Sequence, residues 1–215
     1  MPLIISIVGK SESGKTTLLE GLIARLKQRG YRVAVIKHSA EDVEFDTVNK
    51  DSWRFSQAGS EVSAVTSLHK MAVFKNIAHD LNPQELSQFI GSDYDIILTE
   101  GFKQGNHPKI EVHRQEQGKE LVSSPKQLLA VVTDEPLNVE APQFSKDEVP
   151  LIADLIENTL TAQNGEDIDL FVNDTYIPIN KPFKNLLFRT LVAMVSGLKG
   201  IKEIKSLRIF WRRKD

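Results

Sequence analysis

The sequence predicts an α/β fold, a three-layer sandwich with a mostly parallel sheet, followed by a small α+β unit at the C-terminal end. An apolar run, Leu3–Val8, leads into a glycine-rich segment and then into a stretch with helical periodicity. Further apolar runs recur up to residue 134 between polar segments, as expected of buried parallel strands. Residues 164–215 read as a separate basic ββαβ unit, so we expect one nucleotide-binding domain at 1–163 and this unit at 164–215.

The glycine-rich segment, Gly9–Thr16, is predicted to be a phosphate-binding loop, or P-loop. It matches G-x-x-x-x-G-K-[ST] and has the strand before it and the helix after it that this motif requires. Its glycines allow backbone N–H groups to surround an anion, and the helix adds the positive end of its dipole. Lys15 is expected to reach the β- and γ-phosphates and the Thr16 hydroxyl to ligate Mg²⁺. The predicted nucleotide-binding residues here are Gly9, Lys10, Ser11, Glu12, Ser13, Gly14, Lys15, Thr16 and Thr17.

The first helix is predicted over Lys15–Arg29, and Gly30 is its expected C-terminal cap. Leucines and isoleucines at helical spacing form one apolar face: Leu18, Leu19, Leu22, Ile23 and Leu26. The next strand, Tyr31–Lys37, is mostly apolar, which is the composition of an interior parallel strand. Such a strand–helix–strand unit places the P-loop at the carboxyl ends of the strands.

The polar segment 37–57 lies where a loop that senses the γ-phosphate belongs in P-loop proteins. Asp46 and Asp51 could hold Mg²⁺ directly or through water, and Lys50 and Arg54 could meet phosphate. The alternative is a solvated loop followed by a helix that starts at Asp51.

Two later strands each end in a carboxylate. Strand 95–100 ends in Glu100, the position of the second magnesium-site carboxylate in P-loop proteins, where Asp is usual. Glu100 and Asp46 are therefore the candidate catalytic and metal residues, together with Thr16 as a metal ligand. Asp134 follows strand 128–133 and is placed to accept from N1 and N2 of guanine, but the Asn-Lys-x-Asp signature is absent, so base recognition stays open.

The remaining elements follow from shorter patterns. We expect strands at 61–66, 70–74 and 110–113, helices at 83–90 and 147–160, a linker at 161–166, a hairpin over 168–179, a helix from Pro182, and a strand at 204–211.

Composition excludes several classes of site. The absence of cysteine excludes disulfides, thiolate zinc sites and cysteine nucleophiles. No run approaches the roughly 20 apolar residues of a membrane span and no signal peptide is visible, so we expect a cytoplasmic protein with no membrane partner. Residues 181–215 carry ten basic and two acidic side chains, a net charge of +8, which leaves −10 for residues 1–180. That basic end suits a polyanionic ligand or an acidic protein partner, or is a solvated face of a packing module; nucleic acid is not expected.

Several of these segments together resemble the MobB family, the GTP-binding adapters of molybdopterin guanine dinucleotide synthesis. The resemblance covers roughly residues 1–160. It rests on the P-loop, on Val35–His38, on Asp46–Arg54 ahead of Ala58–Gly59, on Thr99–Lys103 running into His107–Lys109, and on Val132–Pro136. It implies a P-loop domain that binds GTP with Mg²⁺, has weak GTPase activity, forms a homodimer, and assists the MobA-like guanylyltransferase that joins GMP to molybdopterin, with the pterin cofactor as a further ligand.

This sequence departs from the family pattern at two places. Ser39–Asp42 stands where members carry further histidines, and Lys10 resembles the lysine that reaches across the dimer in MinD-like proteins. Contact of Lys10 with the partner's nucleotide is therefore a hypothesis. No arginine that would act in cis on the γ-phosphate is evident.

Two other classes of P-loop protein are alternatives to this family. A nickel-type metallochaperone GTPase normally carries Cys or a His-rich tract, whereas this chain has five scattered histidines and no Cys. A small-molecule kinase needs an Arg-rich lid and a carboxylate for its acceptor, and neither stands out.

Overall fold

The computed structural model describes residues 2–39, 41–91, 93–118, 120–162, 168, 170–173, 175–198, 204, 207 and 209. The chain divides into two compact units, an N-terminal unit at Pro2–Leu160 and a C-terminal unit at Thr161–Asp215. Each unit is described by itself.

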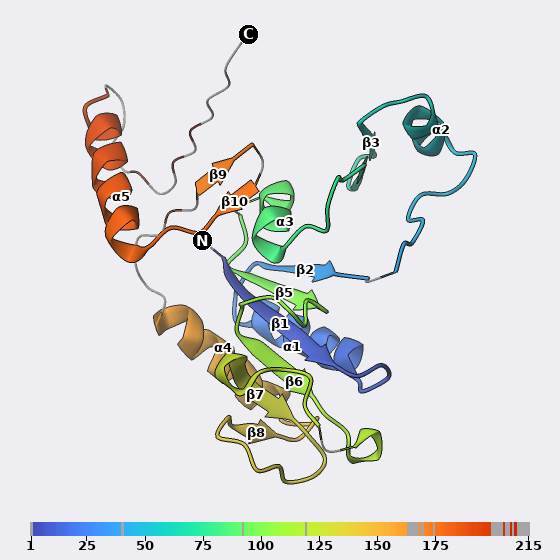
Figure 1. Ribbon diagram of the computed structural model, residues 1–215, viewed down its shortest axis with the longest axis vertical. Helices are drawn as coiled ribbons and strands as arrows, with labels where there is room; N and C mark the ends of the chain where they lie inside the picture. Colours follow the sequence, from blue (N-terminus) through green and yellow to red (C-terminus); the bar gives the residue numbers. More distant parts are fainter. Residues whose placement is uncertain are drawn as a thin grey trace. The chain divides into compact units, whose positions relative to one another are not determined.

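The centre of the N-terminal unit is a parallel sheet (Figure 1). Among the described residues its strands are β1 (Leu3–Gly9), β2 (Val33–Lys37), β5 (Ile96–Glu100), β6 (Lys109–Val112), β7 (Leu128–Val132) and β8 (Gln143–Phe144), in the order β2-β5-β1-β6-β7-β8. Every neighbouring pair runs parallel. The strand that carries the P-loop therefore lies inside the sheet, between β5 and β6.

The predicted interior position of β2 is wrong. Within the described chain β2 is an edge strand, because β5 lies between it and β1 and no strand pairs with its other side. Its Val35 side chain is 43% exposed, as an edge position allows. An apolar, β-branched composition identified the strand, but the order of strands depends on a segment sixty residues further along the chain.

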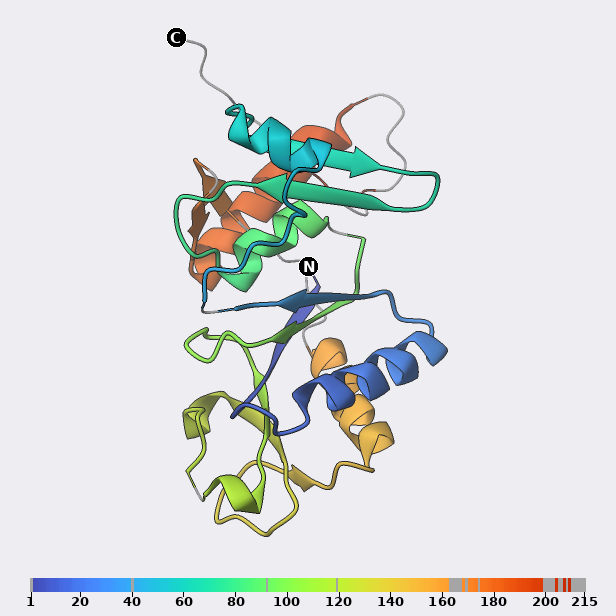
Figure 2. The same ribbon diagram turned by 90° about the vertical axis from the view of Figure 1, so that its right-hand side faces the viewer.

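Helices cover both faces of the sheet and complete three layers. Helices α1 (Lys15–Gln28) and α4 (Val149–Ala162) lie side by side on one face, where Figures 1 and 2 agree. The leucines of α1 and Ile152, Ala153 and Ile156 of α4 form the larger core with alternate residues of β1, β5, β6 and β7. Helix α3 (Pro83–Ile90) packs Leu86 and Ile90 on the other face. The helix expected at 147–160 is confirmed and extends through Ala162, into the first two residues of the predicted linker.

Hydrogen bonds from residues at and just after the C-terminal end of α1 to α4 fix this layer at its edge. The Arg29 guanidinium donates to Asp154 Oδ1 and to Glu157 Oε2 at 2.5 and 2.6 Å, and the Tyr31 hydroxyl donates to the other Glu157 oxygen at 2.6 Å. These bonds join the C-terminal end of α1 to α4, so the helix that starts at the P-loop is held at its far end.

A hairpin and a short helix stand between β2 and α3 in the sequence. Helix α2 (Asp51–Gln57) starts at Asp51, as the solvated-loop alternative expected, and packs on β3 (Val62–Thr66), which pairs antiparallel with β4 (Met71–Lys75). Two 3₁₀ turns, η1 (Gln115–Gln117) and η2 (Pro125–Gln127), lie between β6 and β7.

The described part of the C-terminal unit consists of a hairpin and a helix. Strands β9 (Leu170–Val172) and β10 (Thr175–Ile177) pair antiparallel, and α5 (Lys181–Ser196) follows with Asn180 as its N-cap. The hairpin and helix predicted here are confirmed. The strand predicted at 204–211 lies mostly outside the described residues, as do residues 163–167 of the predicted linker.

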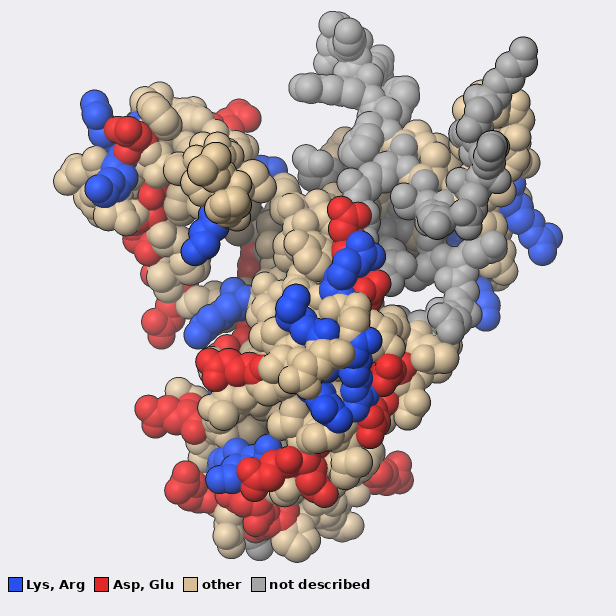
Figure 3. Space-filling model, turned by 180° about the vertical axis from the view of Figure 1, so that it is seen from behind, with Lys and Arg blue, Asp and Glu red and all other residues tan. Residues whose placement is uncertain are grey.

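Charge is mixed over the surface of the N-terminal unit. In the lower part of Figure 3, which shows this unit, acidic and basic side chains are interspersed. No helix in the described ranges has both the length and the apolar character needed to cross a bilayer.

Candidate phosphate-binding site

The P-loop connects the end of β1 to the start of α1, as the motif predicts. Gly14 is the N-cap of α1 with a φ of +95°, and Gly9 has a φ of +147°. A β-carbon built on Gly9 would lie 2.3 Å from the Val112 carbonyl oxygen and 2.9 Å from Ser13 Oγ. The loop therefore needs glycine at position 9, because β6 approaches its backbone closely and because L-residues rarely adopt this φ.

Two polar groups of the loop are placed for an anion. The Ser13 side chain is 1% exposed, and its hydroxyl has no hydrogen-bond partner among the described residues. Lys15 Nζ donates to the Lys10 carbonyl oxygen at 2.5 Å. Burial lowers the pKa of Lys15, while the charge of Glu100 acts in the opposite direction. A phosphate in the loop would give the ammonium a charged acceptor in place of a carbonyl and would give Ser13 a partner.

Glu100 lies beside the P-loop because β5 is the neighbour of β1. The sheet register aligns Glu100 with Ile7 of β1 and with Lys37 of β2. Thr16 Oγ1 donates to Glu100 Oε2 at 3.3 Å, and Lys37 Nζ is 3.7 Å from Oε1. Two of the three predicted metal ligands, Thr16 and Glu100, are thus in contact.

These residues fit Mg²⁺ rather than an all-protein metal site. Among the described residues there is no group of three or more His, Cys, Asp or Glu side chains that could hold a metal ion. Mg²⁺ in nucleotide sites is held by one or two protein oxygens, with phosphates and water as the other ligands. A hydroxyl and a carboxylate beside a phosphate-binding loop supply that set.

Asp46, the third predicted ligand, has different partners. Its Oδ1 accepts from Ser52 Oγ at 3.0 Å and from the Thr47 backbone N–H at 2.8 Å, which ties it to the start of α2. Its Oδ2 is buried and has no partner among the described residues. Asp51 pairs with Arg54 at 3.7 Å on the exposed side of α2. The described contacts of this loop thus do not bring Asp46 to Thr16 and Glu100.

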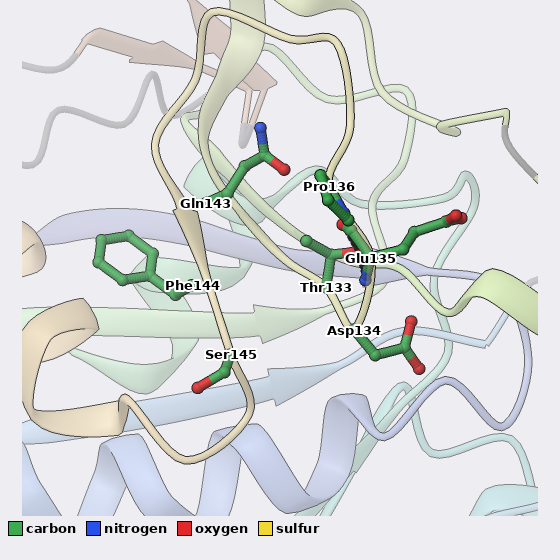
Figure 4. Close-up of a pocket in the computed structure, with 7 residues that line it drawn as sticks. All are labelled: Thr133, Asp134, Glu135, Pro136, Gln143, Phe144 and Ser145. Atoms are coloured by element: carbon green, nitrogen blue, oxygen red, sulfur yellow. Dashed lines mark hydrogen bonds between the residues drawn. The ribbon is translucent and has the colours of Figure 1, made fainter.

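Asp134 lines a cavity of about 400 Å³ at the carboxyl ends of β7 and β8. The lining residues are Thr133, Asp134, Glu135, Pro136, Gln143, Phe144 and Ser145 (Figure 4). The Gln115 N–H donates to Asp134 Oδ1 at 2.9 Å, and this bond is the main reason that the pKa of Asp134 is lowered. In Figure 4 the Phe144 ring points away from Asp134, and it packs on the larger core. The cavity therefore offers an ionised carboxylate without an aromatic platform.

Turn η1 contacts the P-loop, which the sequence did not indicate. Lys10 Nζ donates to the Gln117 carbonyl oxygen, and Gln117 Nε2 donates to the Ser11 carbonyl oxygen at 2.7 Å. Lys10, proposed to reach a partner's nucleotide, thus contacts its own chain in this structure. Arg114 precedes the turn with its guanidinium beside Gly14. The position of Arg114, unlike the contacts of Gln117, could have been inferred from the sequence. Arg114 follows a predicted strand, and the strands of a parallel sheet end at the same edge as the P-loop.

Comparison with known proteins matches residues 4–134 to the family model described as "Molybdopterin guanine dinucleotide synthesis protein B", MobB. The chain is similar to the molybdopterin-guanine dinucleotide biosynthesis adapter protein of Haemophilus influenzae, 41% identical over 75% of this chain and 92% of that one. A putative adapter of the same name from Methanocaldococcus jannaschii is 26% identical over 96% of each chain, so the match includes most of the C-terminal unit. The crystal structure of Bacillus subtilis MobB is 27% identical, with a TM-score of 0.61, over 77% of this chain and 100% of that one.

Proposed function

The chain belongs to the MobB family, and on that basis we propose that it is a GTP-binding adapter in molybdenum cofactor biosynthesis that assists the formation of molybdopterin guanine dinucleotide. The observation that carries this proposal is the P-loop itself. It holds a buried Ser13 hydroxyl with no partner among the described residues and a half-buried Lys15, and both lie beside the Thr16–Glu100 pair in the sequence and the sheet. That arrangement suits the phosphates of a nucleotide with Mg²⁺.

Each residue of this site has a defined task. Lys15 binds the β- and γ-phosphates, and the backbone of residues 9–14 surrounds them with N–H donors. Thr16 and Glu100 would hold Mg²⁺, which neutralises phosphate charge when bound. Glu100 also orients a water near the γ-phosphate, consistent with slow hydrolysis and no more. Asp46 reaches this site only if the loop 38–50 rearranges, which is the change expected of a nucleotide-sensing loop.

Asp134 is proposed to select guanine. Its carboxylate, kept ionised by the Gln115 N–H, can accept from N1–H and from the N2 amino group of the base. Asp134→Asn replaces one carboxylate acceptor by an amide donor. That change suits xanthine, which carries a carbonyl oxygen at C2 where guanine carries its amino group. The variant should lose affinity for GTP and gain affinity for XTP; equal losses for both nucleotides would show that Asp134 does not read the base.

The hairpin β3–β4 is proposed as a contact of the homodimer. By the hairpin register its Val62, Met71 and Val73 side chains lie on one face and are 47%, 70% and 51% exposed, an apolar surface that a second copy would bury. Sedimentation equilibrium of the wild-type chain should give the mass of a dimer, and Met71→Glu should shift it toward the monomer. A wild-type monomer at micromolar concentration would refute this assignment.

Equilibrium binding of fluorescent GTP in the presence of Mg²⁺ tests nucleotide binding. Lys15→Ala should weaken affinity by about 10- to 100-fold, since one charge-assisted phosphate contact contributes about 1.5–3 kcal/mol. Lys27→Ala, on the exposed side of the same helix, is the matched control and should bind as the wild type does. Equal affinity of Lys15→Ala and wild type would contradict the proposed site.

A further inference from the structure

Turn η1 links the two ends of the candidate nucleotide site. The Gln115 N–H bonds to the Asp134 carboxylate, at the cavity proposed for the base. Two residues later, Gln117 bonds to Ser11 through its amide and to Lys10 through its carbonyl oxygen, both in the phosphate-binding loop. The turn therefore fixes the spacing between the place expected for the base and the place expected for the phosphates.

Arg114 enters the space between these two ends. A β-carbon built on Gly14, the N-cap of α1, would lie 3.2 Å from Arg114 Nη2. Nη1 donates to the His113 carbonyl oxygen at 3.2 Å, which orients the guanidinium plane. The charge of Arg114 also reaches Asp134, where it contributes to lowering the pKa of that carboxyl. One cation is thus next to the P-loop backbone and within electrostatic range of Asp134.

We propose that Arg114 binds the nucleotide at its α-phosphate, the phosphate attached to the sugar. This inference rests on the proposed function, because it takes the P-loop and Asp134 as the two ends of the bound molecule. A nucleotide that spans them places its sugar and α-phosphate between them, where the guanidinium lies. In the proposed function Lys15 binds the β- and γ-phosphates and Glu100 holds the Mg²⁺ beside them. Because the α-phosphate is present in both GDP and GTP, Arg114 would contribute to the binding of both nucleotides. Arg is suited to the task because its planar fork bonds two phosphate oxygens at once.

The competing explanation is that Arg114 only supports its own turn. Its bond to the His113 carbonyl and its attraction to Asp134 would then stabilise residues 113–117 whether or not a nucleotide is bound. Such a role would alter the stability of the free protein, but it would leave the electronic environment of one particular phosphorus atom unchanged. The experiment must therefore report on the phosphates individually.

The test uses the full chain in wild-type, Arg114→Ala, Arg114→Lys and Arg25→Ala forms. Arg25 is an exposed arginine on α1 and serves as the matched control. Dissociation constants for GDP and GTP with Mg²⁺ are measured first. Arg114→Ala should weaken both by a similar factor of about 10 to 100, Arg114→Lys should weaken both less, and Arg25→Ala should match the wild type.

Phosphorus NMR of bound GDP then assigns the contact. In Arg114→Lys, which keeps the charge but loses the two-pronged geometry, the α-phosphorus resonance should move and the β-phosphorus resonance should stay. The inference is overturned if the α resonance stays in both Arg114 variants, if only the β resonance moves, or if affinity is lost for GTP but retained for GDP. Failure of the wild-type chain to bind either nucleotide would refute the proposed function instead, which separates the two failures.

Discussion

Replacing Gly9 by alanine tests the geometry on which the P-loop depends. The added methyl group would lie 2.3 Å from the Val112 carbonyl oxygen, well inside van der Waals contact, and that oxygen belongs to the backbone of β6. The φ of +147° is also a conformation that alanine rarely adopts. Because neither the sheet backbone nor the end of β1 can move freely, we expect the variant to be destabilised by both effects.

The magnitude follows from the two contributions. Backbone strain costs about 1–3 kcal/mol and overpacking against rigid neighbours about 1–3 kcal/mol, so Gly9→Ala should lower the free energy of unfolding by about 2–6 kcal/mol. Gly30→Ala is the matched control. Gly30 also has a positive φ, +90°, but a β-carbon there would meet nothing within 4 Å. It should therefore cost about 1–2 kcal/mol, from conformation alone.

Urea unfolding followed by far-UV circular dichroism measures both variants against the wild type. The expected order of stability is wild type, then Gly30→Ala, then Gly9→Ala, with a clear gap between the two variants. If Gly9→Ala is as stable as Gly30→Ala, the close approach of β6 to the loop does not exist in solution and the reasoning fails.

Three further predictions concern stability. Hydrogen bonds from Tyr31 and Arg29 lower the pKa of Glu157, so its stabilising contribution should be fully present above pH 4.5 and should be lost as the pH falls through the lowered pKa. Glu157→Gln should therefore be less stable than the wild type in urea at pH 7, and the difference should shrink as the pH falls below 4.5; a difference that stays constant would contradict this role. Burial, aided by the charge of Lys109, lowers the pKa of His107 to about 4. As the pH falls from 6.5 to 4 the unfolded chain therefore binds a proton at His107 before the folded chain does, and the free energy of unfolding should fall by up to about 3 kcal/mol. His107→Asn should remove this dependence of stability on pH, and an unchanged dependence would exclude the effect. Leu22→Ala, at a side chain with no exposed surface, should cost about 2–5 kcal/mol in urea unfolding, and a cost below 1 kcal/mol would contradict the packing of α1.

Local patterns predicted the part of the fold that forms the phosphate site. The strand, glycine turn and helix of residues 3–28 are adjacent in sequence. The spacing of the leucines and isoleucine between Leu18 and Leu26 predicts the apolar face of α1, because these residues all lie in one helix. The sequence also predicts that Glu100 lies near Thr16, since the carboxyl ends of parallel strands meet at one edge of a sheet.

Long-range order was beyond the sequence patterns. The edge position of β2 is set by the insertion of β5 beside β1, which no property of residues 31–37 encodes. Gln117 belongs to a short polar turn without periodicity, so its contact with the P-loop appears only when β6 is placed next to β1. The partners of Asp46 lie in the following helix, and a serine at the second position of α2 gave no signal for them.

Competition between GTP and ATP for the wild-type chain, with and without Mg²⁺, tests the central claim most directly. The account predicts that GTP displaces a fluorescent guanine nucleotide at a concentration at least tenfold lower than ATP does, and that binding weakens when Mg²⁺ is removed. Equal or tighter binding of ATP would contradict a guanine-nucleotide adapter and would return the kinase class to consideration.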